Sequence, residues 1–226
     1  MLKLAPSILA ADFACLGDNI SQAVEGGAQY IHVDVMDGRF VNNLSVGEAV
    51  VSSISKMAII KEKQTVLDVH LMVQRPYDFI ESFANAGADI INFHLEAEGN
   101  PFEIIKKIKG LGKRAAITIK PETPAREVFK YLSEVGMVLV MSVEPGFGGQ
   151  KIMDSCLEKA KVISEYIKAN NLDVDIEMDG GITIGNVKKV INCGVNVVVS
   201  GSEVFRNVDY DIKGAVAAFF KEFGGN

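Results

Sequence analysis

Hydrophobic residues in this chain gather in short runs that alternate with longer amphipathic segments from one end to the other. The runs are rich in Ile and Val and rarely alternate with polar residues, as is typical of parallel strands covered on both faces. They predict strands over residues 2–9, 30–35, 65–71, 89–94, 114–119, 137–142, 174–178 and 195–200. The amphipathic segments predict helices over residues 12–25, 47–56, 76–86, 101–110, 124–132, 153–169, 185–192 and 211–223.

Glycines at the helix ends support this alternation. A glycine stands between helix and strand at Gly27, Gly87, Gly112, Gly136 and Gly194, which is where helix C-caps favour glycine. Eight strands and eight helices in strict order predict an α/β fold, a single (β/α)₈ TIM barrel over residues 1–226. The alternative is an open doubly wound sheet, but its usual nucleotide-binding fingerprint after the first strand is missing here.

Composition and charge narrow the classes of partner. The chain has 226 residues, of which 48% are hydrophobic and 23% charged, enough for a large core. Its net charge is -6 and no basic stripe stands out, so a nucleic-acid partner is not expected. No signal peptide or membrane span is apparent, so no membrane partner is expected either. Three isolated cysteines, Cys15, Cys156 and Cys193, suit a reducing compartment, and the cytoplasm is the expected location.

Histidines and carboxylates occur at several predicted strand ends. His32 and Asp34 share one face of the second strand because side chains alternate along a strand. Burying them requires a partner, either a shared metal ion or a simple His–Asp hydrogen bond. Active sites of such barrels lie at the C-terminal strand ends, so His32, Asp34, His70 and Asp179 could converge there. They would form a nitrogen and oxygen set for one divalent metal, with Zn, Fe, Mn and Co all suitable.

The third histidine, His94, ends the fourth strand and is interpreted as a hydrogen-bonded core residue.

Glycine-rich loops follow the sixth, seventh and eighth strands. They contain Gly146, Gly148, Gly149, Gly180, Gly181, Gly201 and the adjacent Ser202. Glycine lets the backbone approach an anion closely, and barrels of this type often hold phosphate near the last two strands. Tight turns are the alternative explanation for any one loop, whereas three adjacent loops favour phosphate.

The histidine–carboxylate set and the glycine-rich loops are both expected at the C-terminal end of the barrel. Together they predict a small phosphorylated substrate with its reactive end at the metal. Two carboxylates facing each other suit the transfer of a proton from one face of a carbon to the other. That carbon should lie next to a carbonyl, so that the metal stabilises the enediolate as a Lewis acid.

Six motifs together resemble the ribulose-phosphate 3-epimerase family over essentially the whole chain. They are Ala-Pro-Ser-Ile-Leu-Ala-Ala-Asp-Phe at 5–13, His-Val-Asp-Val-Met-Asp-Gly at 32–38, Asp-Val-His-Leu-Met at 68–72, Met-Ser-Val-Glu-Pro-Gly-Phe-Gly-Gly-Gln at 141–150, Asp-Gly-Gly at 179–181 and Ser-Gly-Ser at 200–202. The resemblance implies a (β/α)₈ barrel of the ribulose-phosphate-binding type. It also implies a metal-dependent isomerase of the pentose phosphate pathway that interconverts ribulose 5-phosphate and xylulose 5-phosphate.

The resemblance also implies residue roles. His32, Asp34, His70 and Asp179 would bind the metal, with Asp34 as the base and Asp179 as the acid in one direction. Ser7 and His70 would contact the sugar, and Gly146, Phe147, Gly148, Gly149, Gly180, Gly181, Gly201 and Ser202 would hold the phosphate. Met36, Met72 and Met141 would form an apolar wall over the enediolate, or else simply pack in the core. Asp37 is interpreted as a structural turn residue before Gly38.

Three features depart from the family pattern. Asn42 stands where proline is usual, Lys120 stands where asparagine is common before Pro121, and the segment 56–64 is extended. The first two lie near the mouth and leave the exact sugar open.

Other functions remain as alternatives. A hexulose-phosphate 3-epimerase acting on allulose 6-phosphate would use the same machinery. A hexulose-phosphate synthase would require lysine at position 36, where this chain has Met36. A non-catalytic sugar-phosphate-binding barrel would not need both carboxylates and both histidines. We also expect a homo-oligomer, either a dimer or a hexamer.

Overall fold

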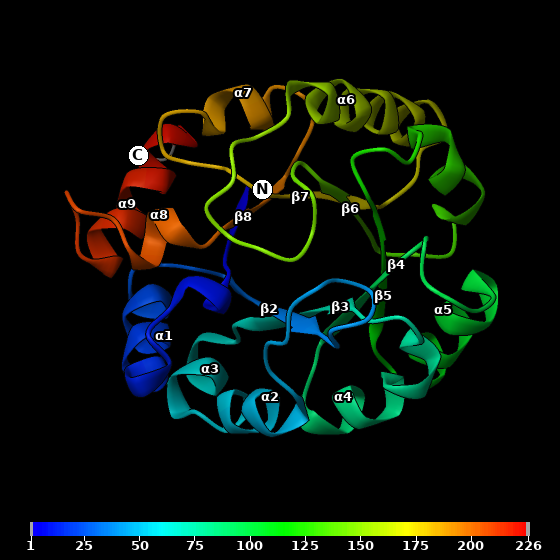
Figure 1. Ribbon diagram of the computed structural model, residues 1–226. Helices are drawn as coiled ribbons and strands as arrows, with labels where there is room; N and C mark the ends of the chain where they lie inside the picture. The colour runs from blue at the N-terminus through cyan, green and yellow to red at the C-terminus, as the bar shows by residue number, and fades with distance from the viewer. Residues whose placement is uncertain (1, 225–226) are drawn as a thin grey trace.

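Eight parallel strands curl into one sheet, and helices surround it on the outside (Figure 1). This computed structural model describes residues 2–224. The order of strands in the sheet is β1-β8-β7-β6-β5-β4-β3-β2, and a parallel bridge between Ser7 and His32 brings the two edges together. The predicted (β/α)₈ barrel is confirmed.

The strands are short and nearly all buried, as parallel barrel strands must be. They are β1 (Lys3–Pro6), β2 (Tyr30–Met36), β3 (Val66–Met72), β4 (Ile90–His94), β5 (Arg114–Ile119), β6 (Met137–Met141), β7 (Asp175–Asp179) and β8 (Val197–Ser200). The α-helices are α1 (Leu16–Glu25), α2 (Glu48–Ser55), α3 (Ala58–Lys63), α4 (Ile80–Ala86), α5 (Pro101–Gly110), α6 (Asp154–Ala169), α7 (Val187–Ile191), α8 (Ser202–Phe205) and α9 (Ile212–Glu222). Short 3₁₀ turns are η1 (Ile8–Ala10), η2 (Phe13–Cys15), η3 (Pro76–Asp78) and η4 (Ala125–Tyr131).

The structure corrects several predicted elements. The helices predicted over residues 12–25 and 76–86 begin with the 3₁₀ turns η2 and η3, and their α-helical parts start at Leu16 and Ile80. The first strand ends at Pro6 rather than at residue 9, because the Ser7 hydroxyl accepts a hydrogen bond from the Leu9 amide and turns the chain into η1. Residues 125–131 form 3₁₀ turns rather than an α-helix. Their two buried residues, Val128 and Tyr131, are three positions apart, which is the spacing that a 3₁₀ turn places on one side.

The extended segment 56–64 forms the extra helix α3. Ile60 is its buried residue, and the helix packs against α1. It ends at Gln64, which has a left-handed backbone with φ of 52°. The extension therefore adds to the outer layer of helices.

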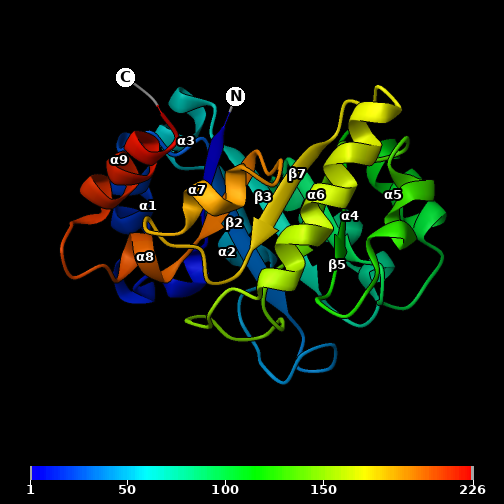
Figure 2. The same ribbon diagram turned by 90° about the horizontal axis from the view of Figure 1, so that it is seen from above.

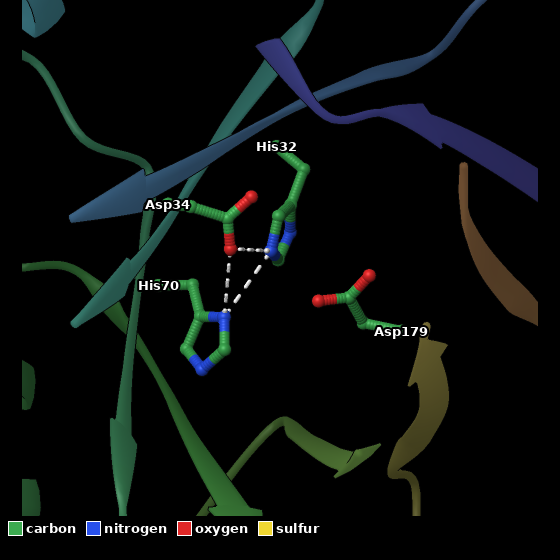
Figure 3. Close-up of side chains that lie close together, drawn as sticks. All are labelled: His32, Asp34, His70 and Asp179. Atoms are coloured by element: carbon green, nitrogen blue, oxygen red, sulfur yellow. Dashed lines mark hydrogen bonds and ion pairs between the residues drawn. The ribbon is translucent and has the colours of Figure 1, made fainter. Parts of the chain in front are cut away.

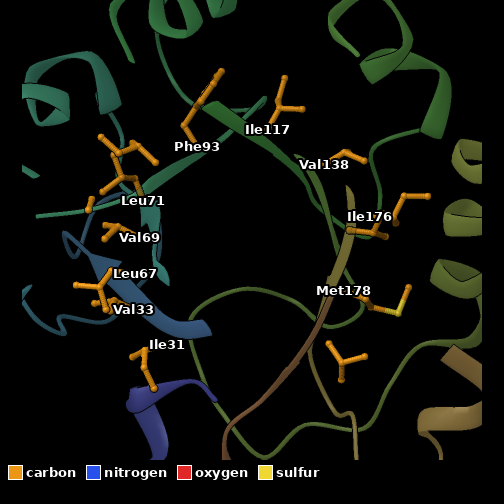
Figure 4. Close-up of a cluster of buried hydrophobic side chains, with 14 of the residues drawn as sticks. Ile31, Val33, Leu67, Val69, Leu71, Phe93, Ile117, Val138, Ile176 and Met178 are labelled. Atoms are coloured by element: carbon orange, nitrogen blue, oxygen red, sulfur yellow. The ribbon is translucent and has the colours of Figure 1, made fainter. Parts of the chain in front are cut away.

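The main hydrophobic core lies between the strands and the surrounding helices. Outward-facing strand residues such as Ile31, Val33, Val69 and Phe93 are essentially inaccessible to solvent (Figure 4). Burial of this apolar surface is the dominant stabilising contribution to such a fold. It also holds the strands in a fixed register, so the inward-facing side chains occupy defined positions.

The inside of the barrel changes character along its axis. A separate apolar cluster of Ala5, Tyr30, Ile90, Ala116, Met137, Val197 and Val199 lies inside the barrel, and four of its members begin their strands, namely Tyr30, Ile90, Met137 and Val197. The next inward positions are polar, with His32, Asp68, Asn92, Thr118 and Glu177 all fully buried. Further along β2 and β3, Asp34 and His70 pair in register near the C-terminal ends of the strands.

The loops after β2 and β6 extend from the same end of the barrel, away from the chain termini (Figure 2). The Asn43 amide of the first loop donates a hydrogen bond to the Gly146 carbonyl of the second, at 2.9 Å. The two loops therefore lie side by side over the C-terminal strand ends.

Between residues 2 and 224, no helix combines the length and the apolar character needed to cross a membrane. Cys15, Cys156 and Cys193 are all free thiols.

Charged side chains join distant strands at the N-terminal end of the barrel. Asp175 Oδ2 accepts hydrogen bonds from Lys3 Nζ at 2.8 Å and from Arg114 Nη2 at 2.7 Å. Asn196 donates to the other oxygen of Asp175 at 2.6 Å. Burial alone would raise the pKa of Asp175, but the bonds from Lys3 and Arg114 outweigh it and lower that pKa.

We expect Asp175→Asn to lower the free energy of unfolding at pH 7 by about 1–2 kcal/mol, after allowance for partial solvent screening. Because the pKa of Asp175 is lowered on folding, this stabilisation is present above its ordinary value of about 3.9 and is lost as pH falls further. Urea unfolding of wild type and variant at pH 7 and pH 3.5 should show the difference shrinking. Glu134→Gln, which removes an exposed pair with Lys109, is the matched control and should change stability by less. A difference that stays constant with pH would contradict this account.

Candidate active site and metal centre

Four ionisable side chains converge inside the C-terminal end of the barrel (Figure 3). His32 and Asp34 come from β2, His70 from β3 and Asp179 from β7. Each offers one ligand atom, and these four atoms all lie within 4.8 Å of one another. In Figure 3 Asp179 faces the other three residues from the far side of the gap between them. The convergence predicted from the sequence is therefore present.

The nitrogen and oxygen atoms of this cluster suit a divalent metal. His32 Nε2 and His70 Nδ1 lie 3.3 Å apart. Asp34 Oδ1 lies 3.3 Å from the first and 3.2 Å from the second. Two imidazole nitrogens and two carboxylates form a donor set that fits Zn, Fe, Mn or Co, and the spacing of the atoms fits a single ion. A simple His–Asp hydrogen bond accounts for only part of this cluster, because Asp179 makes no such bond with the other three.

The pKa values of the two carboxylates of the cluster shift in opposite directions. Burial would raise the pKa of Asp34, but the charges and hydrogen bonds of His32 and His70 outweigh it and lower that pKa. Burial, and then the charge of Asp34, raises the pKa of Asp179 to about 6. Of the two residues, Asp179 therefore retains a proton more readily. Ser7 lies beside Asp34, and its hydroxyl donates to Asp34 Oδ2 at 2.6 Å.

The Nδ1 side of the His32 ring bonds to a buried carboxylate. Its Nδ1 lies 2.6 Å from Asp68 Oδ2, and its Nε2 is directed at His70 within the candidate metal cluster. Burial opposes protonation of His32, but the charges of Asp34 and Asp68 outweigh that effect and raise its pKa. Glu177 lies next to this pair, and burial together with the charge of Asp68 raises the pKa of Glu177 well above its ordinary value. A second group of possible metal ligands, His32, Asp68 and Glu177, is thus better explained as the support of His32.

His70 has a different neighbour on its other side. Its Nε2 lies 2.9 Å from Nε2 of His94, and His94 Nδ1 lies 3.2 Å from Glu96 Oε2. Burial lowers the pKa of His94 to about 4. The prediction of a hydrogen-bonded core histidine is confirmed, but its partner is one of the candidate metal ligands.

A cavity of about 470 Å³ opens above the cluster. Asp34 and Asp179 reach its lining, whereas His32 and His70 lie beneath it. The predicted phosphate-binding residues all line this cavity, namely Gly146, Phe147, Gly148, Gly149, Gly180, Gly181, Gly201 and Ser202. Ser7, Met36, Met72 and Met141 line it as well. The residues singled out for different roles therefore surround one space.

Glycine is required at one of these positions by close approach of the backbone. Gly181 has φ of +65°, and a side chain there would meet backbone atoms of Gln150 and Ile152. The loops after β6 and β7 are thus packed directly against each other. Tight packing and an exposed backbone both explain these glycines, so the turn and phosphate interpretations are compatible.

The three methionines occupy two sides of the cavity. Met36 and Met72 form a small apolar cluster with Val41, and Met141 packs with Leu139 and Val143. All three are almost completely buried yet line the cavity. They therefore serve both as packing residues and as the apolar surface of the site.

Loop residues near the mouth include the positions that depart from the family pattern. Asn42 is exposed. Lys120 places its Nζ 4.0 Å from the centre of the Phe40 ring, a cation–π contact. Asp37 accepts hydrogen bonds from the amides of Arg39, Phe40 and Gln74, so its interpretation as a turn residue is confirmed.

Sequence reasoning missed Arg206 in this site. Among the described residues that line the cavity, Arg206 is the one with a positively charged side chain. Its Nε donates to the Ala10 carbonyl at 2.8 Å, which ties α8 to the turn after β1. The nearby Gly201 and Ser202 pointed to a phosphate-binding loop in this part of the chain. A single arginine four residues further on belongs to no motif, so the sequence did not indicate that it reaches the cavity.

Comparisons with known proteins point to one family. Residues 3–205 match the family model of the ribulose-phosphate 3 epimerase family. A ribulose-phosphate 3-epimerase of Synechocystis is 42% identical over 211 residues, covering 92% of this chain and 90% of the relative. The Bacillus subtilis enzyme of the same name is 40% identical over 210 residues, covering 92% and 94%. A rice relative, named as the cytoplasmic isoform of this enzyme, is 40% identical over 207 residues, covering 90% and 87%.

Solved structures of lower identity share the fold. A 3-hexulose-6-phosphate synthase matches with a TM-score of 0.68 at 14% identity, covering 98% of this chain and 99% of the other. A phosphoribosyl anthranilate isomerase from Thermococcus kodakaraensis matches with a TM-score of 0.68 at 15% identity, covering 100% of both chains. At this identity the likeness extends to the barrel alone. The family model and the relatives near 40% identity go further, and the chain belongs to the ribulose-phosphate 3-epimerase family.

Proposed function

We propose that this chain is an isomerase that interconverts D-ribulose 5-phosphate and D-xylulose 5-phosphate by moving a proton at C3. The observation that carries the proposal is the pair of carboxylates, Asp34 and Asp179, that line one cavity and lie beside two imidazoles. Their ligand atoms lie within 4.8 Å of one another, close enough to flank a single carbon and its oxygens. Membership of the epimerase family supports the same activity.

One divalent metal ion is the cofactor we propose, held by His32, Asp34, His70 and Asp179. When bound, such an ion supplies Lewis-acid stabilisation of the negative charge that develops on the substrate oxygens at C2 and C3. The donor set accommodates Zn, Fe, Mn or Co.

Asp34 and Asp179 would carry the proton. In one direction the Asp34 carboxylate removes the proton from C3 on one face, and the carboxylic acid of Asp179 delivers a proton to C3 on the opposite face. Asp34 ends protonated and Asp179 ionised, and the reverse direction restores both. The raised pKa of Asp179 suits the acid role, and the lowered pKa of Asp34 suits a group that begins ionised. Ser7 orients Asp34 through its bond to Oδ2.

The glycine loops after β6, β7 and β8 would bind the phosphate through their backbone amides. The net charge of -6 gives no general attraction for an anion, so local donors must provide it. Arg206 adds a positive charge to the lining of the same cavity. The three methionines would exclude water from the reacting carbon.

The proton transfer is tested directly in heavy water. Wild type loaded with a divalent metal and given ribulose 5-phosphate should incorporate deuterium at C3, as followed by NMR or mass spectrometry. Asp34→Asn and Asp179→Asn should each lower kcat on the order of 100-fold or more, because an amide neither accepts nor returns the proton. Asp154→Asn, which alters an exposed carboxylate on α6, is the control and should retain activity. Absence of incorporation with all four metals would refute the epimerase proposal, and normal activity of either site variant would refute the two-carboxylate mechanism.

Removal of the metal should abolish turnover reversibly. Treatment with a strong chelator followed by dialysis should leave the folded but inactive protein, and each of Zn, Fe, Mn and Co should then be added in turn. Recovery of activity with at least one of them, near one equivalent per chain, is the expected result. Full activity in chelated protein shown by elemental analysis to be free of metal would contradict the proposal.

Substrate choice separates the two candidate sugars. We expect kcat/KM to be higher for ribulose 5-phosphate than for allulose 6-phosphate. The comparison requires only the two ketose phosphates and the same deuterium readout. A preference of more than tenfold for the six-carbon substrate would replace the proposed activity with that of a hexulose-phosphate 3-epimerase.

A further inference from the structure

We infer that His94 and Glu96 are positioning residues that fix the tautomer and ring orientation of His70, so that His70 presents Nδ1 to the metal. The inference rests on the proposed metal site. It concerns His94, a buried histidine that takes no part in the proposed proton transfer.

The two ring nitrogens of His70 face different surroundings. Nδ1 lies 3.2 Å from Asp34 Oδ1 and 3.3 Å from His32 Nε2, so it belongs to the metal-binding cluster. Nε2 points the other way and lies 2.9 Å from Nε2 of His94. His70 is fully buried, so water does not compete for either nitrogen.

Metal binding determines where the protons must be. A nitrogen that binds a metal uses its lone pair, so a neutral His70 that binds through Nδ1 carries its hydrogen on Nε2. That N–H donates to His94 Nε2, which must therefore be the unprotonated nitrogen of His94. The hydrogen of His94 then lies on Nδ1, from which it donates to Glu96 Oε2 at 3.2 Å.

Glu96 is anchored at the outer end of this chain of hydrogen bonds. Its Oε1 accepts a hydrogen bond from the Lys120 amide at 2.8 Å and another from the Thr123 hydroxyl. These donors, together with the bond from His94, lower the pKa of Glu96 to about 2, although burial alone would raise it. A carboxylate accepts but cannot donate, so the direction of every bond from Glu96 to His70 is determined.

Ring packing holds the same arrangement. The rings of His70 and His94 stack with centroids 5.0 Å apart and planes inclined by 25°. The ring of Phe40 packs against His94 with a centroid distance of 4.6 Å. His94 is thus confined between the metal ligand and the loop after β2, and rotation of its ring is sterically restricted.

The two proposed histidine ligands, His32 and His70, are therefore oriented by different hydrogen-bond partners. His32 bonds directly to a carboxylate, Asp68, at 2.6 Å. His70 reaches its carboxylate through a second imidazole. In both cases the partner sets the tautomer and makes the ligand nitrogen more basic, which strengthens metal binding.

Variants of His94 test the inference through metal affinity, measured by competition with a chromophoric chelator using Co²⁺. His94→Met removes the acceptor, and we expect it to weaken Co²⁺ binding about 10- to 100-fold. His94→Gln keeps an oxygen acceptor near the position of Nε2, and we expect it to retain most of the affinity. Thr65→Val is the control, because Thr65 is buried next to the start of β3 and its hydroxyl makes no hydrogen bond within the described residues.

The outcomes separate a positioning role from packing. Wild-type affinity in His94→Met would overturn the inference, and so would equal losses in the Met and Gln variants. If wild type bound none of the metals, the proposed metal site would fail and the inference with it. If both His94 variants failed to fold, Glu96→Gln would decide, because loss of the anchoring charge should weaken Co²⁺ binding and unchanged affinity would overturn the inference.

A spectroscopic measurement reads the tautomers directly. The chain contains 3 histidines, so ¹⁵N-labelled imidazoles in the Zn²⁺-loaded protein can be assigned with single variants. We expect hydrogen on Nε2 of His70 and on Nδ1 of His94. Hydrogen on Nε2 of His94 would overturn the inference, whatever the activity of the enzyme.

Discussion

The cost of burying ionisable side chains determines which residues lie together inside the C-terminal half of this barrel. Burying a histidine or a carboxylate is costly unless its polar atoms have partners. Here most of the partners are other polar side chains inside the barrel, although Asp68 Oδ1 and Glu177 Oε1 have none among the described residues. Asp68 supports His32, Ser7 bonds to Asp34, and His94 connects His70 to Glu96. One ligand atom each from His32, Asp34, His70 and Asp179 lies within 4.8 Å of the others, and a divalent cation there would offset the buried negative charge.

The apolar parts of the structure make this arrangement possible. The outer core between strands and helices fixes the register of β2 and β3, so that His32 lies beside Asp68 and Asp34 beside His70. The inner apolar cluster packs together the first residues of β2, β4, β6 and β8. Rigid strands therefore carry the groups that need accurate placement, whereas the loops after β6, β7 and β8 carry the backbone that surrounds the cavity.

Much of the fold could be predicted because its cause is local. Apolar runs, amphipathic segments and glycine C-caps occur along the chain in the order of the elements they form. The errors had local causes too, in the Ser7 cap that ends β1 early and in the 3₁₀ spacing of Val128 and Tyr131. The helix α3 was missed because it is short and only one of its residues, Ile60, is buried.

The sequence by itself determined the alternation of elements, the strand ends at which His32, Asp34, His70 and Asp179 stand, and the family to which their motifs point. Only the tertiary structure decided which nitrogen faces the metal site, because that depends on side chains from different strands. It also placed His94 against His70, one of the proposed metal ligands, and Arg206 in the lining of the cavity. Periodicity places a residue on a face of its own element, whereas the closure of the barrel decides which faces meet.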